Sequence, residues 1–287
     1  MPDVPFLRMD RLVSLAASRW SGQQKKLHRL RIPILMYHSI SHELDTRRAP
    51  YYRTVTSPRT FARQMRWLAR EGYQVISLAD AGRRLGTAAG ADAERLVAIS
   101  FDDGFRDFFT EAHPVLSDLG FPSTVFLATD YLDRQFPTGR DCLRTREVAR
   151  LAAGGVAFGS HTVTHPKLRE LTRPQLAREL AESKEAIEHM TGTPVTLFST
   201  PYAFPEDDTA FVHTLANSLQ SFGYTHGVTT CIGRASASDG PLFLSRLPVN
   251  ELDDDKLFAA KLTGGYDWLR PGQRLFKQLK RQLRHVT

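Results

Sequence analysis

The stretch AISFDDGFRD, residues 98–107, joins an apolar run to two adjacent aspartates and a glycine. An apolar run that meets turn residues in this way indicates a buried strand ending at the carboxylates. Neighbouring side chains on a strand point to opposite faces. At a strand end, Asp102 and Asp103 can therefore be directed at two different targets.

Strand-like stretches alternate with helical patterns along most of the chain. The expected strands are 32–40, 73–77, 95–101, 122–129, 156–160, 195–199, 224–230 and 242–249, and the expected helices are 6–20, 57–72, 78–86, 105–120, 145–155, 173–190 and 208–223. This order predicts an α/β fold with a parallel sheet. About seven strands favour a distorted (β/α) barrel over a short open sheet, although periodicity alone leaves both open.

Some helix boundaries are marked by capping residues. Ser57 is an expected N-cap, followed by Pro58 in the first turn. Thr172 and Gln175 have the spacing of a capping box, and Gly192 is expected to end that helix. These signals are local and place helix ends without tertiary information.

The positive charge lies at the two ends of the chain. The net charge is +7, with +5 in residues 1–31 and +6 in residues 269–287, so the middle is slightly acidic. A nucleic-acid-binding domain would spread positive charge over its folded face, so we expect no nucleic-acid partner. We expect three regions: a basic amphipathic segment over 1–31, the main domain over 32–250, and a helical extension with a basic tail over 251–287.

Neither a membrane span nor a signal peptide is expected. No segment approaches ~18 unbroken apolar residues, and charges interrupt the N-terminal apolar run early. Cys142 and Cys231 match neither a disulfide framework nor a zinc knuckle, which indicates two reduced thiols. We therefore expect a cytoplasmic protein.

Two histidines follow another expected strand. In SHTVTHPKL (160–168), His161 and His165 are four residues apart, the spacing of one helical turn, so both rings can face one point. Neutral imidazole suits a metal such as zinc. The alternative is a pair of surface or capping histidines, and spacing alone does not decide between them.

The DDG sequence could complete such a site, although an ordinary turn is the commoner reading of these residues. A catalytic zinc commonly takes three protein ligands and leaves one position for water. One aspartate can be the third ligand, and the other can accept a proton from the water.

Taken together, ISFDDGF (99–105) and SHTVTH (160–165) resemble the first two motifs of the polysaccharide deacetylase family, carbohydrate esterase family 4. ILMYHSI (34–40) is typical of one branch. The resemblance covers about residues 32–250. It implies a distorted (β/α) barrel that removes N-acetyl groups from amino-sugar polymers with a divalent metal, zinc before cobalt or nickel.

The resemblance also implies residue roles. Asp102 would be the catalytic base, and the metal ligands would be Asp103, His161 and His165. In STPYAF (199–204), Tyr202 would hold the oxyanion with its backbone N–H.

The chain departs from the family pattern at three positions. Ser199 replaces an arginine of the third motif, and Ala203 replaces a glycine, which would be strained if that position required a positive φ. Arg246 stands where the last motif has a proton-donating histidine, and arginine cannot give up a proton near neutral pH. The candidate proton donors are Asp102 first, His38 second, and His226.

The tail RLFKQLKRQLRHV (274–286) has the pattern of a basic amphipathic helix. It could lie on the anionic inner face of the membrane or pack on the barrel. The expected substrate is an N-acetylated amino-sugar saccharide, either free, lipid-linked or an exopolysaccharide precursor, and the acyl group could also be formyl. The alternative function is a catalytically impaired relative that binds carbohydrate.

Overall fold

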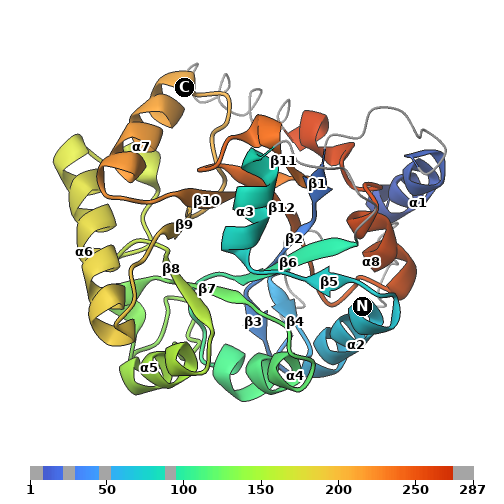
Figure 1. The fold of residues 1–287 in the computed structure, drawn as a ribbon, viewed down its shortest axis with the longest axis horizontal. Helices are drawn as coiled ribbons and strands as arrows, with labels where there is room; N and C mark the ends of the chain where they lie inside the picture. Colours follow the sequence, from blue (N-terminus) through green and yellow to red (C-terminus); the bar gives the residue numbers. More distant parts are fainter. Residues whose placement is uncertain (1–8, 22–29, 45–52, 88–94, 274–287) are drawn as a thin grey trace, which may run out of the picture.

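Seven parallel strands close into a barrel in the computed structural model, which describes residues 9–21, 30–44, 53–87 and 95–273 (Figure 1). In pairing order the barrel strands are β2 (Ile34–Tyr37), β12 (Leu244–Pro248), β10 (His226–Ile232), β9 (Leu197–Ser199), β8 (Ala157–Ser160), β7 (Thr124–Leu127) and β6 (Leu96–Phe101). The β2–β6 pairing closes the ring. The predicted (β/α) barrel is therefore confirmed.

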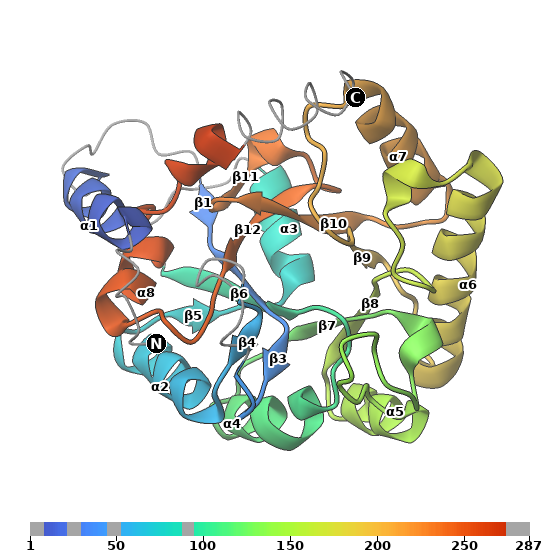
Figure 2. The ribbon, with the colours of Figure 1, turned by 180° about the vertical axis from the view of Figure 1, so that it is seen from behind.

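Helices surround the barrel, as Figure 1 and the reverse view in Figure 2 show. They are α1 (Met9–Ser21), α2 (Pro58–Arg70), α3 (Leu78–Gly86), α4 (His113–Asp118), α5 (Thr145–Ala153), α6 (Arg173–Thr191), α7 (Thr209–Ser221) and α8 (Asp255–Leu262). Short strands lie outside the ring: β5 (Gln74–Val75) beside β6, β3 (Ser39–Ile40) beside β4 (Val55–Thr56), and β1 (Arg31–Ile32) antiparallel to β11 (Ala235–Ser236). The β11 strand was not predicted.

Local capping signals hold in the folded chain. The Ser57 side chain accepts a hydrogen bond from the backbone N–H of Thr60 at the start of α2. Thr172 and Gln175 form the capping box of α6, and Gly192 ends that helix with a φ of 66°. The helix predicted over 105–120 differs, because it begins with a π-helical turn at Phe108–Ala112 before α4.

Alternate residues of the barrel strands point inward and form a separate apolar cluster. Most of its members come from six of the seven strands and from α3, which lies across one end of the barrel in Figure 1; they include Ile34, Ala98, Phe126, Leu197, Val228, Leu244, Leu78, Ala81 and Leu85. The remaining strand, β8, contributes Gly159. The larger apolar cluster lies between the barrel and the outer helices.

The N-terminal helix α1 packs against α8. Arg11 pairs with Asp254 at 2.6 Å, and the Trp268 indole N–H donates to Ser14 at 3.0 Å. Among the described residues, every helix is too short or too polar to cross a membrane. The amphipathic tail predicted at 274–286 lies outside the described residues.

We expect Gly159→Ala to lower the free energy of unfolding by about 1–3 kcal/mol, the usual range for overpacking a core. A Cβ there would lie 2.6 Å from the Phe126 ring and 2.8 Å from the Leu197 carbonyl oxygen. Gly86→Ala is the matched control, because nothing lies within 4 Å of its added Cβ. Urea denaturation measures both, and equal midpoints for the two variants would contradict this packing.

Candidate active site

The loops that follow β2, β6, β8 and β9 meet at the carboxyl end of the barrel. His38 follows β2, and Asp102 follows β6, where its backbone N–H donates to the Tyr37 carbonyl at 3.0 Å. His161 follows β8, and Ser199 ends β9. Parallel strands deliver these side chains to the same end of the barrel because all of them end there.

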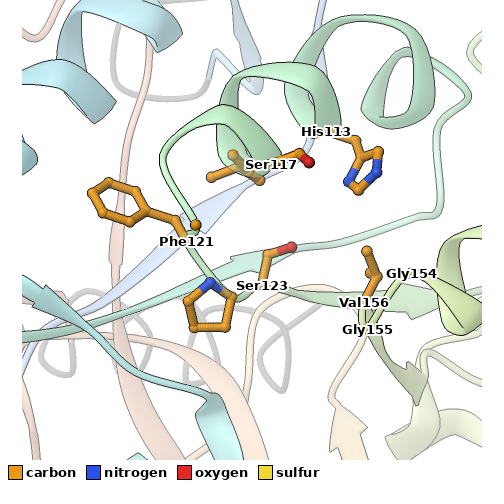
Figure 3. Close-up of a pocket in the computed structure, with 10 residues that line it drawn as sticks. His113, Ser117, Phe121, Ser123, Gly154, Gly155 and Val156 are labelled. Atoms are coloured by element: carbon orange, nitrogen blue, oxygen red, sulfur yellow. The ribbon is translucent and has the colours of Figure 1, made fainter.

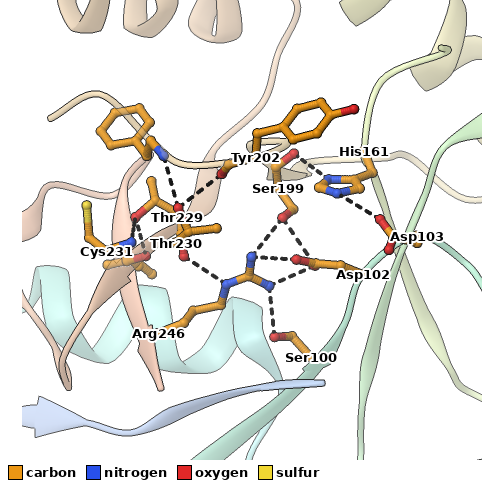
Figure 4. A network of polar contacts seen from close by, with 12 residues as sticks. Ser100, Asp102, Asp103, His161, Ser199, Tyr202, Thr229, Thr230, Cys231 and Arg246 are labelled. Carbon is orange, nitrogen blue, oxygen red and sulfur yellow. Dashed lines mark hydrogen bonds and ion pairs between the residues drawn. The ribbon is translucent and has the colours of Figure 1, made fainter. Parts of the chain in front are cut away.

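The two aspartates diverge because the backbone reverses between them. Asp103 has a φ of 72° and Gly104 a φ of 71°, both left-handed. Aspartate tolerates this conformation better than most residues. A Cβ on Gly104 would also lie 2.7 Å from Leu127, so this position requires glycine. Asp102 consequently faces Arg246 while Asp103 faces the histidines (Figure 4).

Asp103, His161 and His165 form a compact set of potential metal ligands. One ligand atom from each lies within 4.8 Å of the others, and Asp103 Oδ1 is 3.4 Å from His161 Nε2 and 3.3 Å from His165 Nε2. His161 Nδ1 donates to the Ser199 carbonyl at 2.8 Å, which leaves Nε2 free to bind a metal. Two imidazoles and one carboxylate suit zinc and similar divalent ions. The donor set therefore fits a catalytic metal.

Burial and neighbouring charges act in opposite directions on the pKa values of this cluster. Burial alone would raise the pKa of Asp103, but hydrogen bonds from His161 and His165 outweigh it and lower the pKa strongly. Burial alone would lower the pKa of His161, but Asp102 and Asp103 outweigh it and raise the pKa. The carboxylates thus hold positive charge in the site, as a metal site requires.

The two histidines converge, but not through the helical turn expected from their spacing. Residues 161–165 are not helical, and Thr162 and His165 have φ values of 71° and 54°. The Thr162 hydroxyl oxygen accepts a hydrogen bond from the His165 backbone N–H at 3.1 Å. A strained loop, and not a helix, brings the rings to one point.

Arg246 lies inside the barrel with no exposed surface and binds Asp102 through both terminal nitrogens. Nη1 donates to Asp102 Oδ1 and Nη2 to Oδ2, each at 2.7 Å. Nη1 also donates to Ser100 at 3.2 Å, Nη2 to Ser199 at 3.1 Å, and Nε to the Thr229 carbonyl at 3.0 Å (Figure 4). The five N–H groups of the guanidinium are therefore all engaged.

This ion pair controls the protonation of Asp102. Burial alone would raise the pKa of Asp102, but the charge of Arg246, followed by that of His161, outweighs it and lowers the pKa. The carboxylate is therefore ionised at neutral pH and able to accept a proton.

The sequence did not reveal this role of Arg246. Ser199, which stands at the arginine position of the third motif, donates its hydroxyl to Asp102 at 3.2 Å and meets the guanidinium arriving from β12. Side-chain alternation places Arg246 on the same face of β12 as Leu244, two residues earlier, but it does not identify Asp102 as the partner.

The backbone strain expected at Ala203 lies one residue earlier. Tyr202 has a φ of 58°, and Ala203 is not among the described residues with positive φ. The Thr230 hydroxyl holds this loop by donating to the Tyr202 carbonyl at 3.0 Å and accepting from the Phe204 N–H at 2.9 Å. The half-exposed Tyr202 ring lies 4.6 Å from the His165 ring.

Of the other candidate proton donors, His38 belongs to the site and His226 does not. His38 directly follows Tyr37, whose backbone carbonyl accepts the Asp102 N–H at 3.0 Å, so it lies at the same end of the barrel as Asp102. Burial lowers the pKa of His38, and the charges of Asp103 and Asp102 offset this only in part. His226 begins β10 at the other end of the barrel and packs on Gly82 of α3. The prediction that His226 could be a donor was wrong.

A cavity of about 280 Å³ lies at the amino ends of β7 and β8, away from the four converging loops (Figure 3). His113, Phe121, Ser123 and Val156 are among its lining residues. None of the proposed catalytic or metal-binding residues contributes to it.

Comparisons with known proteins agree with this geometry. The sequence model of the family described as "Polysaccharide deacetylase" matches residues 89–226. "Putative polysaccharide deacetylase YxkH" from Bacillus subtilis (strain 168) is 31% identical over 233 residues, covering 81% of this chain and 75% of that protein. A poly-β-1,6-N-acetyl-D-glucosamine N-deacetylase of Escherichia coli (strain K12) is 29% identical over 141 residues, covering 45% of this chain and 20% of that protein.

Solved structures show the same barrel. The Streptococcus pyogenes deacetylase PplD, in complex with acetate, has a TM-score of 0.71 and 25% identity, covering 82% of this chain and 99% of that one. BC0361, a polysaccharide deacetylase from Bacillus cereus, has a TM-score of 0.66 and 25% identity, covering 82% of this chain and 69% of that one. The fold and the site thus define a hydrolase of the N-deacetylase class. The chain belongs to the polysaccharide deacetylase family.

We expect Arg246→Met to lower the free energy of unfolding by about 3–5 kcal/mol, because it leaves the buried Asp102 carboxylate unpaired. Arg178→Met is the matched control, since it breaks an exposed pair with Glu182 and should cost less than about 1 kcal/mol. Urea denaturation of the metal-free proteins measures both. Similar decreases in the free energy of unfolding would show that the buried pair stabilises the fold no more than the exposed pair does.

Proposed function

We propose that this chain hydrolyses the N-acetyl groups of amino sugars in a poly- or oligosaccharide, with Asp102 as the base. The observation that carries the proposal is the pairing of a buried, ionised Asp102 with an adjacent cluster of three metal-ligand atoms. A base beside a metal site is the arrangement that metal-assisted hydrolysis needs.

Asp103, His161 and His165 would hold the divalent ion, with zinc the first choice and cobalt or nickel the alternatives. When bound, such an ion supplies Lewis acidity that activates water and polarises a carbonyl group. The Ser199 carbonyl fixes the ring of His161 by accepting from Nδ1. Ligand rings held in this way need little reorganisation when a metal binds.

Asp102, Arg246 and Tyr202 would each act in the hydrolysis step. Asp102 would accept a proton from the attacking water while Arg246 keeps its carboxylate in place. The Tyr202 backbone N–H would donate to the oxyanion of the tetrahedral intermediate, a contribution often worth about 3 kcal/mol. The C–N bond would then break and release acetate and an amine.

Either Asp102 or His38 could protonate the leaving amine. Arg246 lowers the pKa of Asp102, so this carboxylate gives a proton up readily. Burial keeps the pKa of His38 below its usual value, and the charges of Asp103 and Asp102 offset this only in part. We propose that Asp102 returns the proton, directly or through His38.

The proposed substrates are N-acetylated saccharides such as exopolysaccharide precursors. The relative in E. coli is named for poly-β-1,6-N-acetyl-D-glucosamine, and PplD was solved with acetate. An exposed Tyr202 ring at the site suits the apolar face of a sugar ring. We also propose that the protein is cytoplasmic and that its basic ends contact the inner membrane face. The proposed catalytic region lies between the boundaries at residues 31 and 250.

We expect the purified protein to release acetate from N-acetylglucosamine oligomers, to lose this activity on chelation, and to regain it with Zn²⁺, Co²⁺ or Ni²⁺. The panel should include β-1,4-linked and β-1,6-linked oligomers, with parallel detection of acetate and formate. Asp102→Asn should lower kcat at least about 10²-fold, the lower range for general base catalysis, and should retain the metal. Metal binding without release from any oligomer would favour the carbohydrate-binding alternative, and full activity of Asp102→Asn would contradict the assigned base.

We expect His38→Gln to lower kcat about 10- to 100-fold without changing metal content, because Asp102 alone would then return the proton. His189→Gln on the exposed face of α6 is the matched control. Steady-state kinetics with a β-linked oligomer separates kcat from KM. Wild-type kcat in His38→Gln would assign proton return to Asp102 alone.

A further inference from the structure

The loop that carries both histidine ligands is held in a conformation that its own residues do not favour. Thr162 and His165 have left-handed φ values of 71° and 54°. Non-glycine residues are strained in this region and persist where surrounding contacts determine them. Contacts from another part of the chain must therefore hold the loop.

Glu179, on α6, supplies three of these contacts. Its Oε2 accepts hydrogen bonds from the backbone N–H groups of Val163 at 2.7 Å and Thr164 at 3.0 Å, and its Oε1 accepts from the Thr164 hydroxyl at 2.7 Å. Val163 and Thr164 lie between the two histidines in the sequence. One carboxylate thus fixes the middle of the loop whose ends are the metal ligands.

The position of α6 is fixed one turn further along by a second contact. Ser183 lies 2.7 Å, oxygen to oxygen, from Ser160, whose hydroxyl also accepts the Thr162 backbone N–H at 3.1 Å. Glu179 and Ser183 are four residues apart and therefore lie on the same face of the helix. The helix holds the loop at two points, before and between the histidines.

The charge of Glu179 is directed at the loop. Its side chain is buried, and within the described part of the chain it forms no ion pair with a lysine or arginine. Burying a carboxylate costs free energy unless hydrogen bonds compensate. Here the compensating donors all belong to the histidine loop, and hydrogen bonds to a charged acceptor are about twice as strong as neutral ones.

We propose that Glu179 is the positioning residue of the metal centre: it sets the separation of the His161 and His165 nitrogens and thereby the affinity for the divalent ion. This inference rests on the proposed metal site. Glu179 touches neither ion nor substrate and acts only through the loop. Residues that orient metal ligands typically change metal affinity about 10- to 100-fold when they are replaced.

The test compares Glu179→Gln with Glu182→Gln in the full chain. Glutamine keeps the size of the side chain and one acceptor oxygen but loses the charge and the second acceptor, while Glu182 is an exposed residue of the same helix that pairs with Arg178. The Zn²⁺ dissociation constant is measured by competition with a chromophoric chelator, and the Co²⁺ absorption spectrum reports the ligand geometry. We expect Glu179→Gln to raise the dissociation constant about 10- to 100-fold and to alter the spectrum, with wild-type values for Glu182→Gln.

Thermal melts of the metal-free proteins separate positioning from plain stabilisation. A dissociation constant for Glu179→Gln within twofold of wild type would overturn the proposal, including the case in which only the melting temperature falls. Glu179→Ala, which removes all three contacts, should weaken Zn²⁺ binding further than Glu179→Gln if it folds. Failure of the wild-type chain to bind Zn²⁺ or Co²⁺ at all would instead overturn the proposed metal site.

Discussion

A buried ion pair between Arg246 and Asp102 joins the strands of the barrel to the candidate active site. Its guanidinium reaches from β12 to the end of β6 and also binds groups of β9 and β10. Removing two charges from water is costly, and their attraction repays the cost only with excellent geometry and satisfied remaining donors. The bidentate contact and the three further hydrogen bonds meet that condition, so the same contacts join four barrel strands and hold the carboxylate proposed as the base.

The same ion pair limits what Asp102 can do. A carboxylate whose pKa is lowered stays ionised, but it is a weaker base and holds an added proton weakly. The arginine that occupies the position of the usual proton donor therefore does more than remove that donor. Under the proposed mechanism, it also favours release of the proton from Asp102 to the amine or to His38. Arg246 thus both replaces the usual proton donor and lowers the pKa of Asp102, the residue that we propose returns the proton.

The sequence predicted what depends on local pattern and on strand order. The caps of α2 and α6 are local, and Asp102, Asp103, His161 and His165 follow parallel strands that end at the same edge. The contact of Arg246 required the register between β12 and β6, which no local pattern carries. The role of Glu179 could not be predicted, because it depends on how α6 packs on the loop after β8. His226 was wrongly included among the donors because the sequence did not show that it begins its strand.

Backbone strain marks the site more sharply than residue type does. Among the described residues, five other than glycine have a positive φ, and four of them, Asp103, Thr162, His165 and Tyr202, lie in the converging loops. Two of these loops are held by neighbouring residues: the histidine loop by Glu179 and the Tyr202 loop by Thr230. Contacts from α6 and β10 thus fix the proposed metal-ligand and oxyanion positions. Because these contacts come from the protein itself, the binding free energy of a metal would not have to order the loops.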